Sequence, residues 1–474
     1  MLAKRQFYIN GSWVDPVAAK DLEVINPSTE EPCAVISLGD QADTDAAVAA
    51  ARAAFPAWAA TPMSDRIALI RKFYDIYNAR QAEMGDAISQ EMGAPIDMAT
   101  NSQWGCGPWH MDGFFEALDN FEVERPYRSE RIHMEPIGVC GLITPWNWPM
   151  NQVVLKVIPA LAVGCTIVLK PSEIAPLSGL LFAEMIDEAG FPAGVFNLVN
   201  GDGMGVGSQL STHPDVDMIS FTGSTRAGIA ISKAAADSLK RVSLELGGKG
   251  ANIVFADAPE KAVRNGVLHC MNNSGQSCNA PTRMMVERSY YAEALEIAKA
   301  TAEKVTVDLA SKPGRHIGPV VSEAQFNKIQ GLIETGIKEG ATLIAGGLGR
   351  PEGLNKGYFV RPTVFADVTP DMTIYREEIF GPVLAITPFD SEAEAIEMAN
   401  DTVYGLTNYI QTEDDEKRLR VARSVRSGMV ETNSVGFGHG IPFGGMKQSG
   451  NGREGGPWGL EEFCEVKVIS GCAF

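Results

Sequence analysis

The sequence of 474 residues predicts an α/β fold built on parallel sheets. From residue 137 onward, short apolar runs rich in β-formers alternate with helical runs, which is the pattern of βαβ units. The length suggests two or three compact units, each with its own core. Hydrophobic residues make up 45% of the chain and charged residues 21%, an ordinary balance for a globular protein.

The N-terminal part carries weaker patterns. Residues 1–40 predict short strands and turns, separated by glycine and proline. The Ala-rich residues 41–90 have helical spacing, and we expect Pro56 to end or kink the first helix. A strand pair is expected at Phe121–Val123 and Arg131–Met134, either as a solvated edge or as a pairing site for another subunit.

Two α/β stretches follow, one up to residue 246 and one from Ala251 onward. We find no internal repeat and no low-complexity linker. In chain order, the predicted strands are Ile137–Ile143, Thr166–Leu169, Val195–Val199, Met218–Phe221, Val242–Leu246, Ile253–Phe255, Arg283–Val286, Thr342–Ala345, Val364–Phe365, Val383–Phe389 and Phe463–Ile469, and the predicted helices are Met150–Val163, Leu177–Ala189, Arg226–Ser238, Lys261–Met271, Tyr291–Lys304, Glu323–Glu339 and Glu392–Asn400.

Charge and cysteine content argue against several function classes. A net charge of −19 disfavours nucleic acid and anionic membranes as partners, since both attract basic surfaces. The eight cysteines form no C-x-x-C pair and no His cluster lies near them, so we expect no metal site. We also expect no secretory signal, no membrane span and reduced thiols, hence a cytoplasmic protein.

Two segments at strand ends could bind a cofactor. Phe221-Thr-Gly-Ser-Thr225 opens a helix whose free N–H groups could hold a phosphate, or the serine could simply cap the helix. Lys170-Pro-Ser-Glu173 could hold a ribose diol or form a surface ion pair. Four glycines from Gly201 to Gly207 crowd another turn but do not fit G-x-G-x-x-G.

Three further segments carry reactive side chains. Cys278 lies in a small, polar, turn-rich stretch, unlike the other cysteines, and could be a nucleophile or an inert buried thiol. No histidine adjoins it, in contrast to thiol proteases. Glu245 ends an apolar strand and could be a general base or only cap its loop. Asn147 follows another strand and could donate to an oxyanion or only shape a turn.

Taken in order, these motifs resemble those of the NAD(P)-dependent aldehyde dehydrogenases. The matching runs are Pro-Trp-Asn, Lys-Pro-Ser-Glu, Phe-Thr-Gly-Ser, Glu-Leu-Gly-Gly-Lys, Gly-Gln-x-Cys, Glu-Glu-Ile-Phe-Gly-Pro (377–382) and Pro-Phe-Gly-Gly-Met-Lys (442–447), which span essentially the whole chain. The resemblance implies a Rossmann-like NAD(P)-binding domain over 1–117 and 137–246 and an α/β catalytic domain over 247–447. It also implies a small β arm over 118–136 and 463–474 that joins a neighbour's sheet in a homodimer or homotetramer.

The resemblance also implies the catalytic roles. Cys278 would attack the aldehyde, and the thiohemiacetal oxyanion would be held by the Asn147 side chain and the Cys278 N–H. Hydride transfer to the nicotinamide would leave a thioester, which water activated by Glu245 would hydrolyse. Lys156 matches a family lysine near the active site, although a solvated helix lysine is the alternative. Glu454 matches a proton-relay glutamate of some members.

The cofactor and substrate positions follow from the same resemblance. Glu173 would repel a 2′-phosphate, so NAD is expected, with NADP as the alternative. The substrate positions include no Arg or Lys, which disfavours semialdehydes that carry a carboxylate, and Leu155, where an aromatic residue is frequent, suggests a wide tunnel. Neutral aromatic or aliphatic aldehydes are expected, and a quaternary ammonium aldehyde stays open. The cofactor positions are Ile143, Trp146, Lys170, Glu173, Gly203, Phe221, Gly223, Ser224, Leu246, Glu378 and Phe380, and the substrate positions are Trp148, Asn151, Gln152, Leu155, Ser277, Asn279, Phe437 and Phe443.

Three other functions are alternatives to aldehyde oxidation to the free acid. A coenzyme A-acylating dehydrogenase commonly lacks the base that Glu245 matches. A catalytically silent homologue should have lost Cys278, Asn147 or Glu245, and all three are present. A thiol hydrolase without cofactor would not need the intact cofactor segments.

Overall fold

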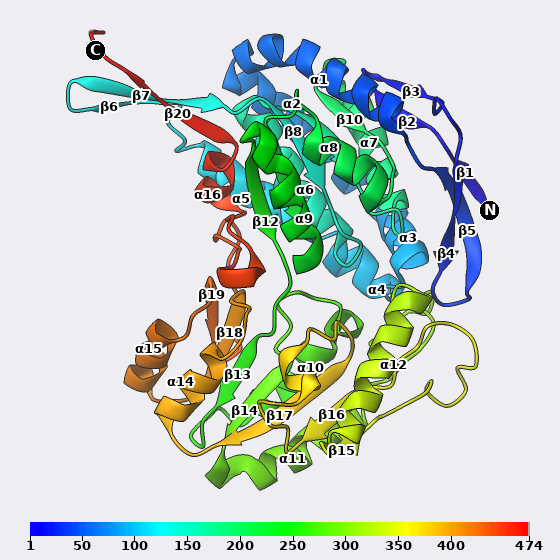
Figure 1. Ribbon diagram of the computed structural model, residues 1–474, viewed down its shortest axis with the longest axis vertical. Coiled ribbons are helices and arrows are strands. Elements are labelled where there is room, and N and C mark those ends of the chain that lie inside the picture. Colours follow the sequence, from blue (N-terminus) through cyan, green and yellow to red (C-terminus); the bar gives the residue numbers. More distant parts are fainter. Residues whose placement is uncertain (473–474) are drawn as a thin grey trace.

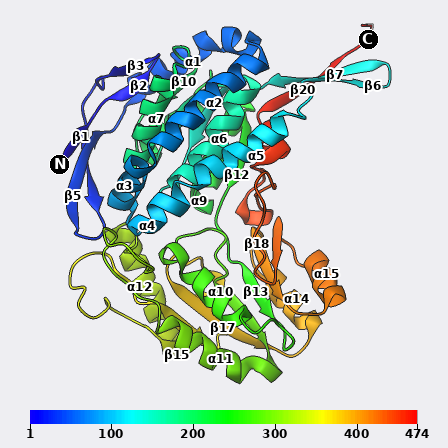
Figure 2. The ribbon, with the colours of Figure 1, turned by 180° about the vertical axis from the view of Figure 1, so that it is seen from behind.

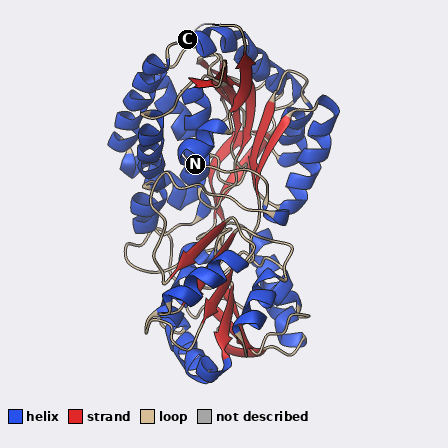
Figure 3. Cartoon of the chain, turned by 90° about the vertical axis from the view of Figure 1, so that its left-hand side faces the viewer, coloured by secondary structure: helices blue, strands red, loops and turns tan. Residues whose placement is uncertain are grey.

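The computed structural model describes residues 1–472 as two α/β lobes and a thin projecting arm (Figure 1). Each lobe contains a seven-stranded sheet with helices on both faces (Figure 3). A three-stranded sheet lies at the N-terminal side of the first lobe, and another makes the arm. No helix among residues 1–472 combines the length and the apolar character needed to cross a membrane.

The first lobe has the strand order β12-β11-β8-β9-β10-β2-β3. The five strands from β12 to β10 are parallel, and the hairpin β2–β3 adds an antiparallel edge. Parallel neighbours end at the same edge, so the loops after β8, β9, β11 and β12 gather there. The elements are β2 (Phe7–Ile9), β3 (Ser12–Val14), β8 (Val139–Ile143), α6 (Pro149–Val163), β9 (Thr166–Lys170), α7 (Leu177–Ala189), β10 (Phe196–Leu198), α8 (Ser208–Thr212), β11 (Met218–Thr222), α9 (Thr225–Ala235) and β12 (Arg241–Glu245).

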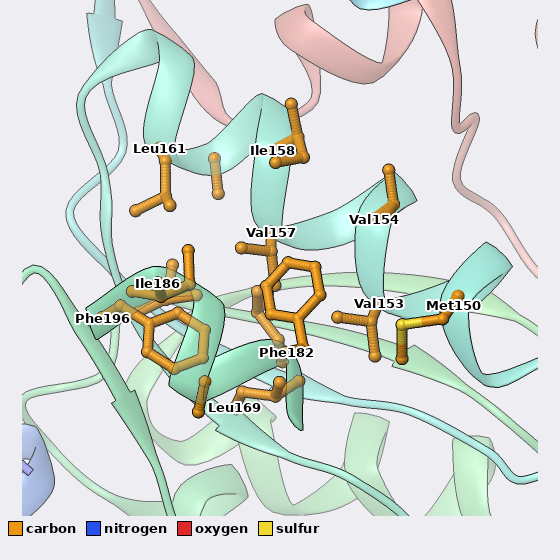
Figure 4. Packing of buried hydrophobic residues seen from close by; sticks show 14 of the residues in the cluster. Met150, Val153, Val154, Val157, Ile158, Leu161, Leu169, Phe182, Ile186 and Phe196 are labelled. Carbon is orange, nitrogen blue, oxygen red and sulfur yellow. The ribbon is translucent and has the colours of Figure 1, made fainter. Parts of the chain in front are cut away.

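Helix α6 is the buried centre of this lobe. Val153 and Val157 pack with Phe182 of α7 and Phe196 of β10 in a continuous apolar cluster (Figure 4). A helix that is apolar all round is stable only when it is covered on every side. Its single charged residue, Lys156, is therefore completely buried, which excludes the alternative of a solvated helix lysine.

The second lobe has the strand order β15-β16-β17-β14-β13-β18-β19. All neighbouring pairs are parallel except β15 with β16. The elements are β13 (Ala251–Val254), α10 (Ala262–Met271), β14 (Arg283–Glu287), α11 (Arg288–Ala302), α12 (Glu323–Lys338), β15 (Thr342–Ala345), β16 (Thr363–Ala366), α13 (Thr373–Arg376), β17 (Val383–Phe389), α14 (Glu392–Asn400), β18 (Thr407–Gln411), α15 (Asp415–Ser424) and β19 (Met429–Thr432). Helix α16 (Gly456–Glu461) comes later in the chain and packs against α6 of the first lobe.

The arm joins two distant parts of the chain (Figure 2). Strand β20 (Cys464–Ile469) pairs antiparallel with β7 (Glu130–Pro136), which pairs with β6 (Glu124–Tyr127). The first arm strand thus begins at Glu124, after the predicted Phe121–Val123, because the N–H groups of residues 119–121 still donate to carbonyls of the preceding helix. Residues 473–474 of the predicted arm lie outside the described residues.

The sequence pattern did not predict the bounds of the N-terminal helices and strands. Helix α1 (Gln41–Ala60) continues through Pro56, so the proline does not end it. Its N-terminus is fixed by a capping box between Asp40 and Asp43. The remaining elements are β1 (Leu2–Lys4), β4 (Asp21–Asn26), β5 (Glu31–Ser37), α2 (Met63–Ala79), α3 (Gln81–Met92), α4 (Ile96–Met98) and α5 (Cys106–Leu118).

Candidate functional site

A cavity of about 240 Å³ lies between the two lobes, where β8, β11 and β12 end. Its lining combines predicted catalytic and cofactor positions, so the structure brings both groups to one place. The lining residues are Pro145, Trp146, Asn147, Thr222, Gly223, Ser224, Leu246, Gly247, Cys278, Gln325, Lys328, Glu378 and Phe380.

Residues Thr222–Ser224, which line the cavity, connect the end of strand β11 to the start of helix α9. The Ser224 hydroxyl accepts a hydrogen bond from the Ala227 N–H (3.3 Å), so the capping interpretation holds. The other first-turn N–H groups remain available for an anion, so the same segment can also bind a phosphate. A Cβ on Gly223 would collide with the Phe221 ring, so this backbone passes too close for any side chain.

Lys170 and Glu173 lie together after β9, outside the lining of this cavity. Lys170 Nζ is 3.2 Å from Glu173 Oε2, and the lysine is buried while the carboxylate is partly exposed. Gly203 begins the turn Gly203–Gly207 after the neighbouring strand β10, and the Lys170 stem lies beside Gly207. A fixed amine next to a reachable carboxylate suits a ribose diol, so these residues fit the outer half of a dinucleotide.

Two glycines after β12 allow three segments to meet. A Cβ on Gly247 would lie 2.6 Å from Glu378 Oε2, and one on Gly248 would collide with the Cys278 carbonyl oxygen. The Gly248 N–H donates to Glu378 Oε1 (2.8 Å). Burial raises the pKa of Glu378. The Gly-Gly pair therefore locks the carboxylate of Glu378 beside the Cys278 loop.

Two residues of α12, Gln325 and Lys328, line the cavity but were not predicted from the sequence. Gln325 Nε2 donates to the Phe380 carbonyl (2.7 Å), and Lys328 Nζ donates to the Glu378 carbonyl (2.8 Å). Phe380 has a left-handed backbone (φ 58°) and packs edge-on against Trp146, with ring centroids 5.4 Å apart. Helical spacing alone gives no signal for such residues.

The Cys278 loop has a strained backbone. It follows α10 through a turn at Asn272–Gly275, in which three successive residues have φ of 52°, 57° and 73°. A Cβ on Gly275 would collide with the Gly381 carbonyl. Desolvation raises the pKa of the Cys278 thiol, and the charges of Glu245 and Glu378 add to this effect. The thiol is thus neutral until a base or a positive charge acts on it.

Asn147 is anchored on both sides to the Cys278 loop. Its Nδ2 donates to the Gln276 carbonyl (3.1 Å), which leaves one amide N–H unused. Its own carbonyl accepts from Asn273 Nδ2 (2.8 Å) and Gln103 Nε2 (3.4 Å). An amide held this firmly beside a thiol can stabilise an oxyanion at low reorganisation cost.

Glu245 lies in a buried charged cluster behind the cysteine. Neither carboxylate oxygen of Glu245 has a hydrogen-bond partner among residues 1–472. Burial raises its pKa well above the usual range, and the nearby Glu454 carboxylate adds to this. Lys156 Nζ forms an ion pair with Glu454 Oε1. A buried, unpartnered carboxyl with a raised pKa fits a general base better than a loop cap.

The predicted substrate positions are only partly brought together. Trp148 Nε1 donates to Ser277 Oγ (2.8 Å), directly beside Cys278. Phe443 pairs through its backbone with Glu454. Leu155 is only 1% exposed and belongs to the apolar core, so the structure gives no support for a widened tunnel there. Among the remaining positions, Asn151 is half-buried, Gln152 is buried and Phe437 is exposed. The Asn279 backbone carbonyl accepts a hydrogen bond from the Tyr409 hydroxyl.

Comparison with known proteins gives full-length matches. The family model described as "Aldehyde dehydrogenase family" matches residues 13–469. A 3-succinoylsemialdehyde-pyridine dehydrogenase from a Pseudomonas species is 50% identical, over 98% of both chains. A crystal structure of an aldehyde dehydrogenase from Bartonella henselae has a TM-score of 0.98 and 59% identity, covering 99% of this chain and 100% of that one.

A second solved structure carries ligands. It is aldehyde dehydrogenase C of Pseudomonas syringae, in a cysteine-to-alanine variant complexed with NAD+ and octanal. It has a TM-score of 0.97 and 47% identity, covering 98% of this chain and 96% of that one.

Proposed function

The chain belongs to the aldehyde dehydrogenase family and is an NAD(P)-dependent aldehyde dehydrogenase, and from this premise we propose that it oxidises a neutral aldehyde to the free acid through a thioester on Cys278. The observation that carries the proposal is that Cys278 and Asn147 line one cavity with Gly223, Ser224 and Glu378. A nucleophile, an oxyanion donor and a dinucleotide-type surface therefore face a common space.

Each catalytic residue has a distinct task. Cys278 attacks the carbonyl carbon after losing its proton, and the free N–H of Asn147 stabilises the resulting oxyanion. Glu245 removes a proton from the hydrolytic water and, in the earlier step, assists removal of the thiol proton. Lys156 and Glu454 form a buried ion pair, and their two charges act in opposite directions on the pKa of Glu245. A free-acid product is favoured over coenzyme A acylation because a water-activating carboxyl is present.

A bound NAD would supply the hydride acceptor for the oxidation. The chain would hold its nicotinamide end with Glu378, Phe380 and Trp146, its pyrophosphate at Gly223 and Ser224, and its adenosine ribose with Lys170 and Glu173. The NAD+ complex of the Pseudomonas syringae relative supports the choice of cofactor. A reducing, cytoplasmic location would keep Cys278 reduced.

We expect purified protein to reduce NAD when given an aldehyde, and Glu173 to control the preference over NADP. Glu173→Gln removes a negative charge from the ribose site and should improve NADP use relative to NAD by about tenfold. Nicotinamide absorbance with both cofactors and a panel of aldehydes measures both effects. Glu303→Gln, at the exposed end of α11, is the matched control and should leave the ratio unchanged. An unchanged ratio in Glu173→Gln would disprove this role.

The substrate class is supported by chemistry at the predicted positions. Trp148, Phe437 and Phe443 offer apolar surface, and none of the eight positions is cationic. Octanal in one relative, and the pyridine semialdehyde in the name of another, are both uncharged aldehydes at neutral pH. We therefore favour neutral aldehydes with an apolar body.

The arm supports a homo-oligomer. Val466 and Val468 lie on one face of β20 and are 62% and 63% exposed. Apolar side chains beside the free edge of a sheet favour pairing with a second copy of the chain.

A double change, Val466→Lys with Val468→Lys, should shift the protein toward monomer, because charges would be buried at that contact. Sedimentation velocity measures the change in mass. Val17→Lys alters an equally exposed valine far from the arm and should have no effect. An unaltered mass in the double variant would contradict the arm's role.

A further inference from the structure

A polar pair links helices α5 and α6. His110 Nε2 lies 2.6 Å from Asn151 Oδ1. His110 is 8% exposed, and Asn151 is half-buried. Asn151 is one of the predicted substrate positions, whereas His110 has no predicted role. Burial also lowers the pKa of His110 to about 4, so its ring is neutral at neutral pH.

The direction of this hydrogen bond fixes both side chains. An amide oxygen only accepts, so the single ring proton of His110 must lie on Nε2. The Asn151 oxygen is then occupied, and its Nδ2 group has no partner among residues 1–472. The histidine therefore orients the amide so that its free groups are donors.

Asn151 lies on helix α6, which begins directly after the segment of Asn147 and Trp148. Trp148, three residues earlier and thus about one turn away, donates to Ser277 beside Cys278. The neighbouring Gln152 Oε1 is buried without a partner, an unsatisfied group that a ligand could satisfy. Trp109, whose ring contacts that of His110, exposes apolar surface, and so do Phe437 and Ile441. Trp109 packs on the His439 ring, which ties α5 to the loop that carries Phe437.

We propose that His110 is a positioning residue that holds the Asn151 amide with its N–H groups toward the aldehyde, so that the enzyme prefers apolar aldehydes with a hydrogen-bond acceptor behind the aldehyde carbon. Such acceptors are a ketone or ether oxygen or a pyridine-type nitrogen. A site built to donate a hydrogen bond rejects an analogue that lacks the acceptor, because its buried N–H groups are then left unpaired. This inference rests on the proposed function.

The test compares hexanal with analogues of equal length in which one methylene is replaced by an ether oxygen at successive positions. In the wild type, kcat/KM should be higher for at least one ether than for hexanal. His110→Leu should lower that ratio about 3- to 10-fold, mainly through KM of the ether. His110→Gln, whose Nε2 can donate to Asn151 in the same way, should restore the ratio to within about twofold.

Two further variants make the outcome decisive. In Asn151→Leu the ether preference should be lost, and adding His110→Leu should then change nothing more. Asn151→Asp still accepts from His110 but presents an oxygen to the substrate, so it should disfavour the ethers. The inference is overturned if hexanal is oxidised normally and the ratio does not respond to His110, or if Asn151→Asp improves the ethers. Failure of the proposed function is a separate result, in which no aldehyde supports NAD reduction.

Discussion

Replacing Cys278 with alanine is expected to lower kcat/KM for aldehyde oxidation by at least about 10⁴-fold, because no thioester can form. The change removes only a sulfur atom from the cavity wall, so the backbone strain at Asn272–Gly275 and the Asn147 anchors should persist. Stopped-flow absorbance of NADH measures both the first turnover and the steady state. Both should vanish together, since hydride transfer follows addition of the thiolate.

Two controls separate lost chemistry from lost structure. Cys472→Ala alters an exposed cysteine at the far end of the arm and should keep full activity. NAD binding to Cys278→Ala, followed by quenching of tryptophan fluorescence, should stay near the wild-type value, since Trp146 lines the same cavity. Full activity in Cys278→Ala would show that the nucleophile is another residue.

The sequence predicted the sheets of both lobes well because buried parallel strands are short apolar runs bounded by turns. It missed β18 and β19 of the second lobe. In β18, Thr407 and Asn408 are polar yet buried. Burial of Asn408 is possible because its Oδ1 accepts the Ala251 N–H from the neighbouring strand β13, whereas Thr407 Oγ1 has no hydrogen-bond partner among residues 1–472. Such cross-strand satisfaction depends on tertiary pairing and leaves no period in the sequence.

The candidate site shows the same division between local and long-range information. Cys278, Glu245 and Asn147 stand at strand or helix ends with unusual neighbours, so a local pattern indicates them. Lys328 and His110 sit within helices of ordinary spacing and become notable only through partners far along the chain, the Glu378 carbonyl and Asn151. A contact between such distant residues cannot be inferred from either segment alone.

Glu245→Gln is expected to separate the two halves of the reaction. The glutamine is of equal size and keeps the pocket filled, but it cannot accept the proton of the hydrolytic water. A first turnover should still give one equivalent of NADH per site, after which the steady-state rate should fall by about 10²- to 10⁴-fold. Equal loss of both phases would place Glu245 in thiol activation alone, and unchanged turnover would exclude it as the base.

The same residue should set the pH dependence. Burial and the Glu454 charge raise the pKa of Glu245, so the carboxyl is protonated at low pH and becomes a base only as the pH rises through that raised value. The wild-type deacylation rate should therefore increase with pH, and this increase should disappear in Glu245→Gln. Glu454→Gln removes the neighbouring negative charge and should lower the pKa of Glu245, which shifts the rise toward lower pH. A profile that does not move toward lower pH would contradict the contribution assigned to repulsion between the two carboxylates.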